Sequence, residues 1–293
     1  MTAQVVGASG RPGRRRGFVA GLPLAPALLW FLLFFVGPFL VLLAFSFHTF
    51  RGLEWLPVFT FENYAETLTS PVFRVIFWRT LTVALSVTVA VLLIAYPFTY
   101  IITFVFPARR QLLYFLVLVT LFGSYLVRIY AWRTILGAEG LINGSLVEVG
   151  LIEEPMRFLL NSPLAVGIAL TNFLVPLAVL PIYSSMQNVS PGLLEAGRDL
   201  GAGQLGLVRR VVFPLTLPGV RVAAAFTFIA AAADYATPAL LGGVSGRMAG
   251  GAIVHEFGST LNWPLGAALA MTLIAGLVVV VVLMWFVMGR LSR

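Results

Sequence analysis

Few residues of this chain could carry out chemistry, and their types exclude several classes of protein. The 293 residues contain no cysteine and only two histidines, His48 and His255, and all 19 basic residues are arginine. Cysteine nucleophiles, thiolate metal sites, lysine Schiff bases and lysine-dependent phosphate-binding loops are therefore excluded. We expect no catalytic residue, no metal site and no bound cofactor. If the protein uses ATP, a partner subunit binds the ATP and magnesium and hydrolyses the nucleotide.

One acidic residue, Asp234, interrupts a long apolar stretch. An acid within a membrane span costs roughly 2.5–3.5 kcal/mol on insertion scales, so such residues usually face a cavity or a partner. Asp234 could attract a cationic substrate, assisted by an aromatic face such as that of Tyr235. Alternatively, it is a structural acid paired with Arg128 or Arg247, or it lies near the external interface. The sequence leaves these interpretations open.

The other candidates for a substrate pathway are Arg128, Tyr130 and Trp132, at the outer end of the third apolar segment. They could gate a pathway, but arginine and aromatic residues at this depth more often form an interfacial belt. We expect His48 and His255 to be ordinary external residues.

The composition predicts the elements that must position these residues. Hydrophobic residues make up 60% of the chain and charged residues 10%, against about 45–50% and about 25% in soluble proteins. Several apolar runs reach the roughly 20 residues that span a bilayer. We expect an all-α membrane protein in which a disordered basic tail, 1–17, precedes a transmembrane domain, 18–293. Its six transmembrane helices are expected at about 24–47, 80–106, 111–127, 163–186, 220–241 and 264–288.

The arginines orient these helices. Twelve arginines and only two acids fall on the side that holds both termini, and seven arginines and eight glutamates fall on the other. Because cytoplasmic loops carry the excess of basic residues, both termini are predicted to be cytoplasmic. The net charge of +8 thus comes from arginines placed beside the apolar spans, as membrane topology predicts. We expect membrane lipid as a partner and no nucleic acid.

The polar loop 187–219 contains a predicted short helix. Ser190 suits a helix cap, Pro191 suits the first turn, and Gly201 suits the end. Between them an apolar stripe recurs at helical spacing, formed by Leu193, Leu194, Ala196 and Leu200. Such a helix could lie on lipid headgroups or dock onto another protein.

This loop resembles the cytoplasmic "EAA" loop of ABC-importer permeases. In that loop Glu-Ala-Ala is followed after three residues by Gly, and after nine more by Ile-x-Leu-Pro. Four residues match at the family spacing: Glu195, Ala196, Gly201 and Pro214. Three exchanges are small or apolar: Gly197 for the second Ala, Val211 for Ile and Phe213 for Leu. Segments 126–132, 180–186, 234–243 and 262–268 are similar to the spermidine/putrescine-type subfamily, and the resemblance extends over about residues 20–290.

The resemblance implies a fold, a function and a set of partners. The fold would be that of a type I ABC-importer permease (MetI-like), with six helices and both termini in the cytoplasm, in the inner membrane of a bacterium. The chain would be a permease subunit that passes a small solute, in particular a polyamine such as spermidine or putrescine, into the cytoplasm. It would assemble with a second permease, two copies of an ABC ATPase and an extracytoplasmic solute-binding protein.

The same resemblance implies that the loop helix sits in a groove of the ATPase. Glu195 is then expected to pair with the partner, and Arg198 and Asp199 to add weak ion pairs at the rim. Ala196, Gly197 and Gly201 would allow close packing. Glycine in place of alanine at 197 should weaken the helix by up to about 1 kcal/mol.

Three other functions are alternatives to a polyamine permease. The importer could carry another solute, such as an amino acid or ferric ion. An intramembrane enzyme needs a nucleophile–base pair or clustered acids at membrane depth, where only Asp234 is evident. A secondary transporter favours broken helices in repeated halves, and no internal repeat is visible.

Overall fold

The computed structural model describes residues 25–51 and 54–290, so the predicted tail at 1–17 lies outside the described residues. The chain divides into two compact units, Met1–Phe45 and Ser46–Arg293. We describe each unit by itself.

The described part of the first unit is one long helix. It consists of α2 (Ala25–Phe31), the π-helical segment η2 (Leu32–Val36) and α3 (Gly37–Phe45). Residues Pro26–Phe45 are long and apolar enough to cross a membrane. The π turn directly precedes Pro38, whose missing amide cannot continue the α-helical ladder.

The second unit begins with a small antiparallel hairpin that the sequence did not predict. Strand β1 (His48–Arg51) pairs with β2 (Glu54–Phe59), with an irregularity between His48 and Thr49. Helix α4 (Glu62–Thr69) follows. The Asn63 amide anchors it to the hairpin, because Nδ2 donates to the carbonyls of Ser46 at 2.9 Å and His48 at 2.8 Å.

The rest of the second unit is helical. Its elements are α5 (Pro71–Tyr100), η3 (Ile101–Val105), η4 (Pro107–Arg109), α6 (Arg110–Leu121), α7 (Tyr125–Leu136), α8 (Leu141–Glu148), η5 (Arg157–Leu159), α9 (Pro163–Gln187), α10 (Pro191–Asp199), α11 (Gln204–Leu207), η6 (Val208–Val212), α12 (Phe213–Ala233), η7 (Pro238–Gly242), α13 (Ala249–Gly258) and α14 (Trp263–Arg290).

The described helices include five that are long and apolar enough to cross a membrane, and a sixth span if one bent pair is counted. The five are Pro26–Phe45, Pro71–Val105, Pro163–Gln187, Gln204–Ala233 and Trp263–Arg290. The bent pair joins Pro107–Leu121 to Tyr125–Glu148 at an angle of 86°. The helical membrane architecture is thus confirmed.

The third predicted helix, 111–127, is wrong in its extent. Helix α6 ends at Leu121 and the chain turns before α7. With 12 residues, α6 is about 18 Å long, well short of the roughly 30 Å hydrocarbon core. Gly123 favours the break because glycine is a poor helix former. The Arg128 guanidinium lies close to its backbone, with Nη2 3.0 Å from the place a Cβ would occupy.

The second and fifth spans begin earlier than predicted. The second begins at Pro71, where proline suits the first turn. The fifth runs without interruption from Gln204 to Ala233, so the second half of the predicted loop 187–219 is helix and Asp234 follows the span instead of lying within it.

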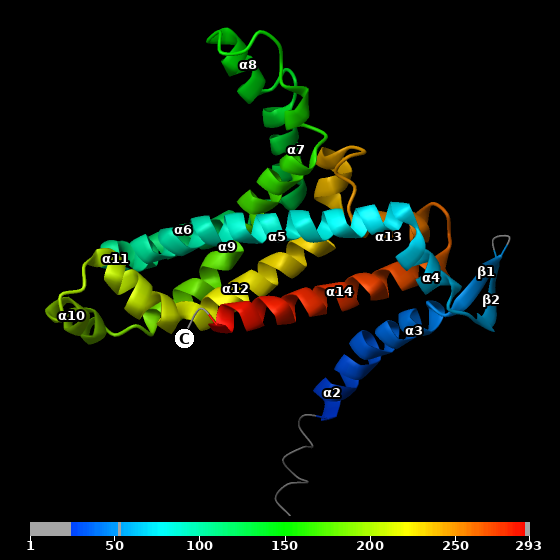
Figure 1. The fold of residues 1–293 in the computed structure, drawn as a ribbon, viewed down its shortest axis with the longest axis horizontal. Coiled ribbons are helices and arrows are strands. Elements are labelled where there is room, and N and C mark those ends of the chain that lie inside the picture. Colours follow the sequence, from blue (N-terminus) through cyan, green and yellow to red (C-terminus); the bar gives the residue numbers. More distant parts are fainter. Residues whose placement is uncertain (1–24, 52–53, 291–293) are drawn as a thin grey trace, which may run out of the picture. The chain divides into compact units, whose positions relative to one another are not determined.

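The core is built by α5, α9 and α12, which pack against one another. Small buried side chains such as Ala84, Ala178 and Ala223 allow helices to approach closely, as is usual in membranes. Within this unit, α10 and α11 lie at the same end as the last turn of α14, whereas α4, the hairpin and α13 lie at the other (Figure 1).

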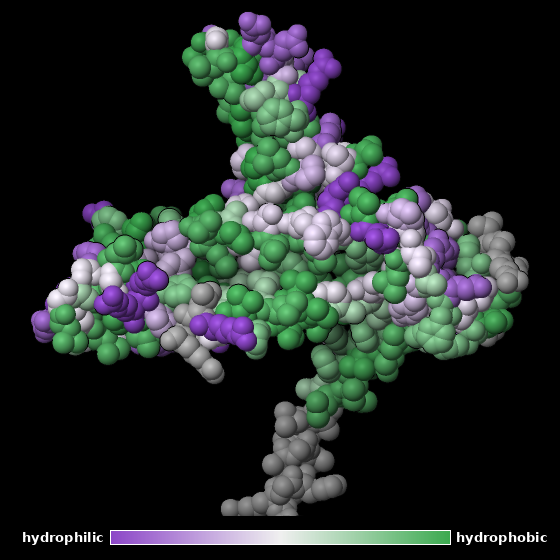
Figure 2. Space-filling view, viewed as in Figure 1, coloured by the Kyte–Doolittle hydropathy of each residue, from purple (hydrophilic) through white to green (hydrophobic). Residues whose placement is uncertain are grey.

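The surface follows the same division. Figure 2 shows hydrophobic residues along the middle of the long helices and hydrophilic residues gathered towards their ends. The hydrophilic end beside α10 and α11 carries Arg209 and Arg210, as the predicted cytoplasmic side should.

Candidate functional site

Helix α10 (Pro191–Asp199) is the predicted loop helix, and it begins where the sequence placed it. Ser190 has an extended backbone, and Pro191 occupies the first turn. The Ser190 side chain makes no capping hydrogen bond, so the start of the helix rests on the proline and the extended residue before it.

The end of α10 is a hydrogen-bonded turn that requires glycine. Gly201 has a φ of +80°, a conformation that is strained for side chains with a Cβ. Its amide donates to the Arg198 carbonyl at 2.8 Å, and the Ala202 amide donates to the Gly197 carbonyl at 3.0 Å. This pair of bonds is the Schellman motif. It explains physically why the loop pattern has a glycine at this position.

Replacing Gly201 with alanine should loosen this turn. The left-handed conformation costs a residue with a Cβ about 1–2 kcal/mol, so backbone amides of 198–202 should exchange hydrogen about five- to thirty-fold faster. Gly192→Ala is the matched control, because no atom lies within 4 Å of its Cβ position. Unchanged exchange in Gly201→Ala would contradict the assigned turn. The measurement is hydrogen exchange by mass spectrometry on the purified protein.

The outer face of α10 is free of contacts within the described chain. Glu195, Ala196, Arg198 and Asp199 are all exposed. None of the three charged side chains forms an ion pair with another described residue. Leu200, which follows the helix, is 88% exposed. The helix therefore presents charges and apolar side chains outward, as a docking surface does.

Pro214, the last position of the pattern, is half-buried. It occupies the first turn of α12, directly after the π-helical η6. The neighbouring Phe213 ring meets Tyr96 of α5 edge to face at 5.6 Å. The Tyr96 hydroxyl lies 3.2 Å from Thr216 Oγ1. The 20-residue pattern therefore reaches from an exposed helix into the packed core.

Asp234 ends α12 and starts the short helical segment that follows. Its Oδ1 accepts from the Tyr125 hydroxyl at 2.7 Å, and its Oδ2 accepts from the Thr237 amide at 3.1 Å. The Thr237 hydroxyl lies 2.6 Å from the Tyr125 oxygen. The bond from the Thr237 amide is an N-terminal cap, a structural role that differs from the arginine pairing considered for this acid.

The partners of Asp234 are neutral. Among the residues that the structure describes, no arginine forms an ion pair with it, so the predicted pairing with Arg128 or Arg247 is wrong for this structure. The half-buried carboxylate opens onto a hollow of about 280 Å³, lined by Tyr125, Leu170, Phe173, Leu174, Ala230, Ala233, Asp234 and Tyr235. Both of its carboxylate oxygens accept hydrogen bonds from uncharged donors.

Asp234 lies at the outer end of its span. Counted from Arg210 at the opposite end, the helix rises roughly 36 Å to Asp234, somewhat more than the hydrocarbon thickness. A carboxylate at this depth is close to the external water, which agrees with the interpretation that placed it near the interface.

Arg128 and Trp132 belong to a second and larger hollow. It has a volume of about 1140 Å³, lies between α5, α6, α7 and α9, and is otherwise mostly apolar. The Arg128 guanidinium carbon lies 5.8 Å from the Phe173 ring centre. Tyr130 is 53% exposed and lines neither hollow. The structure thus places Arg128 and Trp132 at one hollow, Asp234 and Tyr235 at the other, and Tyr130 at neither.

Phe173 and Tyr125 connect the residues of the two hollows, and neither was predicted from the sequence. Their rings lie 4.7 Å apart, with Arg128 beside Phe173 and Asp234 bonded to Tyr125. The Gly123-Ser124 pair could have revealed the break that makes Tyr125 the first residue of α7. Phe173, one of many apolar residues in α9, gave no such signal.

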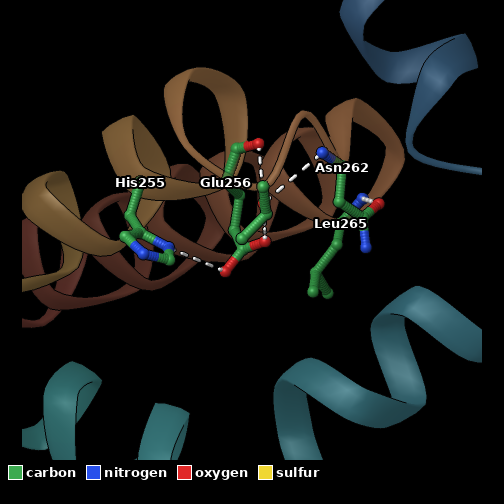
Figure 3. Close-up of polar contacts among 5 residues, drawn as sticks. His255, Glu256, Asn262 and Leu265 are labelled. Carbon is green, nitrogen blue, oxygen red and sulfur yellow. Dashed lines mark hydrogen bonds and ion pairs between the residues drawn. The ribbon is translucent and has the colours of Figure 1, made fainter. Parts of the chain in front are cut away.

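The external corner between α13 and α14 contains the second histidine (Figure 3). The His255 Nδ1 lies 3.6 Å from Glu256 Oε1. The Thr260 hydroxyl donates to Glu256 Oε2 at 2.6 Å, and Asn262 Oδ1 accepts from the Leu265 amide at 3.2 Å. These bonds secure the turn and cap α14.

Comparison with known proteins agrees with this architecture. Residues 94–290 match the family model described as "Binding-protein-dependent transport system inner membrane component". The chain is 35% identical over 266 residues to the spermidine/putrescine transport system permease protein PotB of Haemophilus influenzae, covering 90% of this chain and 91% of that protein. Its identity to PotB of Escherichia coli is 34% over 265 residues, covering 90% and 94%.

A solved structure shares the fold. The crystal structure of a bacterial alginate ABC transporter, in complex with its alginate pentasaccharide-bound periplasmic protein, contains a chain that is 18% identical. The superposition gives a TM-score of 0.73 and covers 95% of each chain. This chain is therefore a multi-pass inner-membrane protein, and it belongs to the family of inner-membrane components of binding-protein-dependent transport systems.

Proposed function

We propose that this chain is a permease subunit of an ATP-driven importer of polyamines such as spermidine or putrescine. The observation that carries the proposal is the Asp234 carboxylate, which opens onto a hollow lined by aromatic rings and whose partners among the described residues are neutral. The names of the PotB relatives support the same solute class.

The chemistry of the hollow suits an alkyl ammonium group. A carboxylate binds an ammonium by charge-assisted hydrogen bonds. The rings of Tyr125, Phe173 and Tyr235 offer π faces to the cation, and Leu170 and Ala230 suit a methylene chain. One ammonium would bind at Asp234, and the other end of a diamine would extend away from it.

The second part of the proposal concerns energy. The chain has no lysine and so no P-loop of its own; ATP and magnesium would be bound by two copies of a partner ATPase. Helix α10 would dock on that ATPase through Glu195, Ala196, Gly197, Arg198 and Asp199. A second permease and an external solute-binding protein would complete the importer, and nucleotide would shift the population between its outward-open and inward-open states.

A second candidate solute is favoured by one observation. The Arg128 guanidinium lies beside the Phe173 ring, and Phe173 packs against the tyrosine that binds Asp234. A solute with both an ammonium and an acidic group, such as an amino acid, could use both charges. Competition between spermidine and amino acids for uptake separates the two candidates.

The experiment that tests the assembly is affinity purification of the tagged protein from native membranes in mild detergent, with mass spectrometry. We expect an ATPase and a second permease to be recovered, and the co-encoded binding protein to bind spermidine or putrescine. A stable complex without any nucleotide-binding subunit would favour a secondary transporter or a membrane enzyme, and α10 would then be an interfacial helix.

Tyr125→Phe tests the proposed ammonium site. The variant keeps the ring but removes the hydroxyl that orients the Asp234 carboxylate. A hydrogen bond to a charged group contributes about 1.5–3 kcal/mol; since the carboxylate keeps its bond to Thr237, we expect a three- to ten-fold higher KM for spermidine uptake. Tyr130→Phe is the control and should leave KM unchanged. Equal KM values in both variants would remove Tyr125 from the site.

A further inference from the structure

Gly197 leaves a notch in α10 that a neighbouring side chain fills. A Cβ at residue 197 would lie 2.5 Å from Leu207 Cδ2 and 3.7 Å from Val211 Cγ2. Carbon atoms in contact prefer about 3.5–4.0 Å, so an alanine methyl at 197 and the present position of Leu207 are mutually exclusive. The space that a methyl group at 197 would take is thus occupied by the side chain of Leu207, ten residues later.

Leu207 is the buried anchor of this part of the chain. It is 3% exposed, whereas Leu205, two residues earlier, is 80% exposed. No residue of α10 itself is buried. Helix α10 makes its contacts with α11 and η6, and among these the Leu207 side chain is the one that enters the notch.

The position of Leu207 in the fold gives this contact a consequence. Leu207 lies near the start of the continuous helix Gln204–Ala233, whose far end leads directly into Asp234. A displacement of α10 that pushes on Leu207 therefore acts on one end of a continuous helix, which includes the π-helical segment η6 and whose other end adjoins the carboxylate site.

We propose that Leu207, seated in the notch of Gly197, is the positioning residue that joins α10 to the transmembrane helix 204–233. This inference rests on the proposed function, because it assigns a role to α10 docking on an ATPase. Leu207 fixes the orientation of α10 relative to helix 204–233. A movement that the partner imposes on α10 is therefore transmitted to the transmembrane helix, which a flexible connection would not do. Coupling of this kind needs a demonstrated energetic link between the two residues.

The test is a double-mutant cycle in the purified importer reconstituted in proteoliposomes. Gly197→Ala adds one carbon to the contact and Leu207→Val removes one, so the two changes together conserve the number of side-chain carbons. We expect each single variant to retain the ATPase subunit but to transport at least three-fold less spermidine per ATP hydrolysed. In the double variant, the amount of spermidine transported per ATP hydrolysed should return to within two-fold of the wild type. The control Gly192→Ala should have the wild-type ratio.

The proposal is overturned if Gly197→Ala alone has the wild-type ratio of transport to hydrolysis, or if the double variant is no better than the worse single variant. Hydrogen exchange over 191–199 provides a second readout. We expect it to rise in each single variant and to recover in the double variant; recovery of exchange without recovery of transport would show that Leu207 packs but does not transmit.

Failure of the underlying function has a different signature. The variant Leu200→Cys, in a chain that has no other cysteine, should be joined to the ATPase subunit by a bifunctional reagent that links its thiol to an amine of the partner. If no ATPase subunit is recovered or cross-linked, docking by α10 is wrong. The non-additive exchange of the Gly197 and Leu207 variants would still support the packing, but not its role in transport.

Discussion

Asp234→Asn is expected to lower the ratio of maximal rate to KM for spermidine uptake about ten-fold or more. The change keeps the size of the side chain but removes the negative charge that faces the hollow. Hydrogen bonds to charged groups contribute about 1.5–3 kcal/mol, and each 1.4 kcal/mol is a factor of ten. Uptake kinetics in cells that express the variant provide the measurement, and recovery of the ATPase subunit should be unchanged.

The control for Asp234→Asn changes the net charge by the same amount elsewhere. Glu139 is an exposed acid on the external side, and Glu139→Gln should leave uptake within two-fold of the wild type. If Asp234→Asn also keeps wild-type kinetics, Asp234 serves only as the helix cap formed with Thr237. Equal losses in both variants would point to a general effect of external charge.

The second large effect is expected from Glu195→Arg. In the proposed docking on an ATPase, this reversal places a positive charge where the partner meets a negative one; disrupting an interfacial charge pair costs about 2–5 kcal/mol. We expect normal membrane insertion, at least ten-fold less co-purified ATPase and a similar loss of uptake. Quantitative mass spectrometry of the purified complex measures the first loss.

Asp199→Asn is the comparison for Glu195. It removes a charge from the last turn of the same exposed helix, and pairs at the rim contribute about 0–1 kcal/mol. We expect a change of no more than about two-fold. Wild-type ATPase recovery and uptake in Glu195→Arg would remove Glu195 from the docking surface.

Much of the architecture could be predicted because hydropathy and charge act locally. Apolar runs identified the spans, and the cap, proline and glycine signals around α10 identified that helix before its contacts were known. The break at Gly123 has a weaker local signal, the Gly123-Ser124 pair. The approach of the Arg128 guanidinium to Gly123 could not be predicted, because an uninterrupted helix would keep these residues apart.

The candidate sites likewise differ in how far the sequence predicts them, according to whether their residues are close together in the chain. The pattern from Glu195 to Pro214 is visible at fixed spacing, so its residues could be named from the sequence. The partners of Asp234 could not, because Tyr125 comes from a different helix 109 residues away. The fit of Leu207 to Gly197 was also hidden, since the sequence shows the loss of a methyl group but not the side chain that takes its place.

Transport itself gives the most direct test of the whole account. The complex purified through this chain would be placed in proteoliposomes with its binding protein outside, and labelled spermidine would be followed with and without ATP inside. We predict accumulation that requires both ATP and the binding protein, and that amino acids do not compete with. Accumulation without nucleotide, or none with spermidine while an amino acid accumulates with ATP, would contradict the proposed polyamine importer.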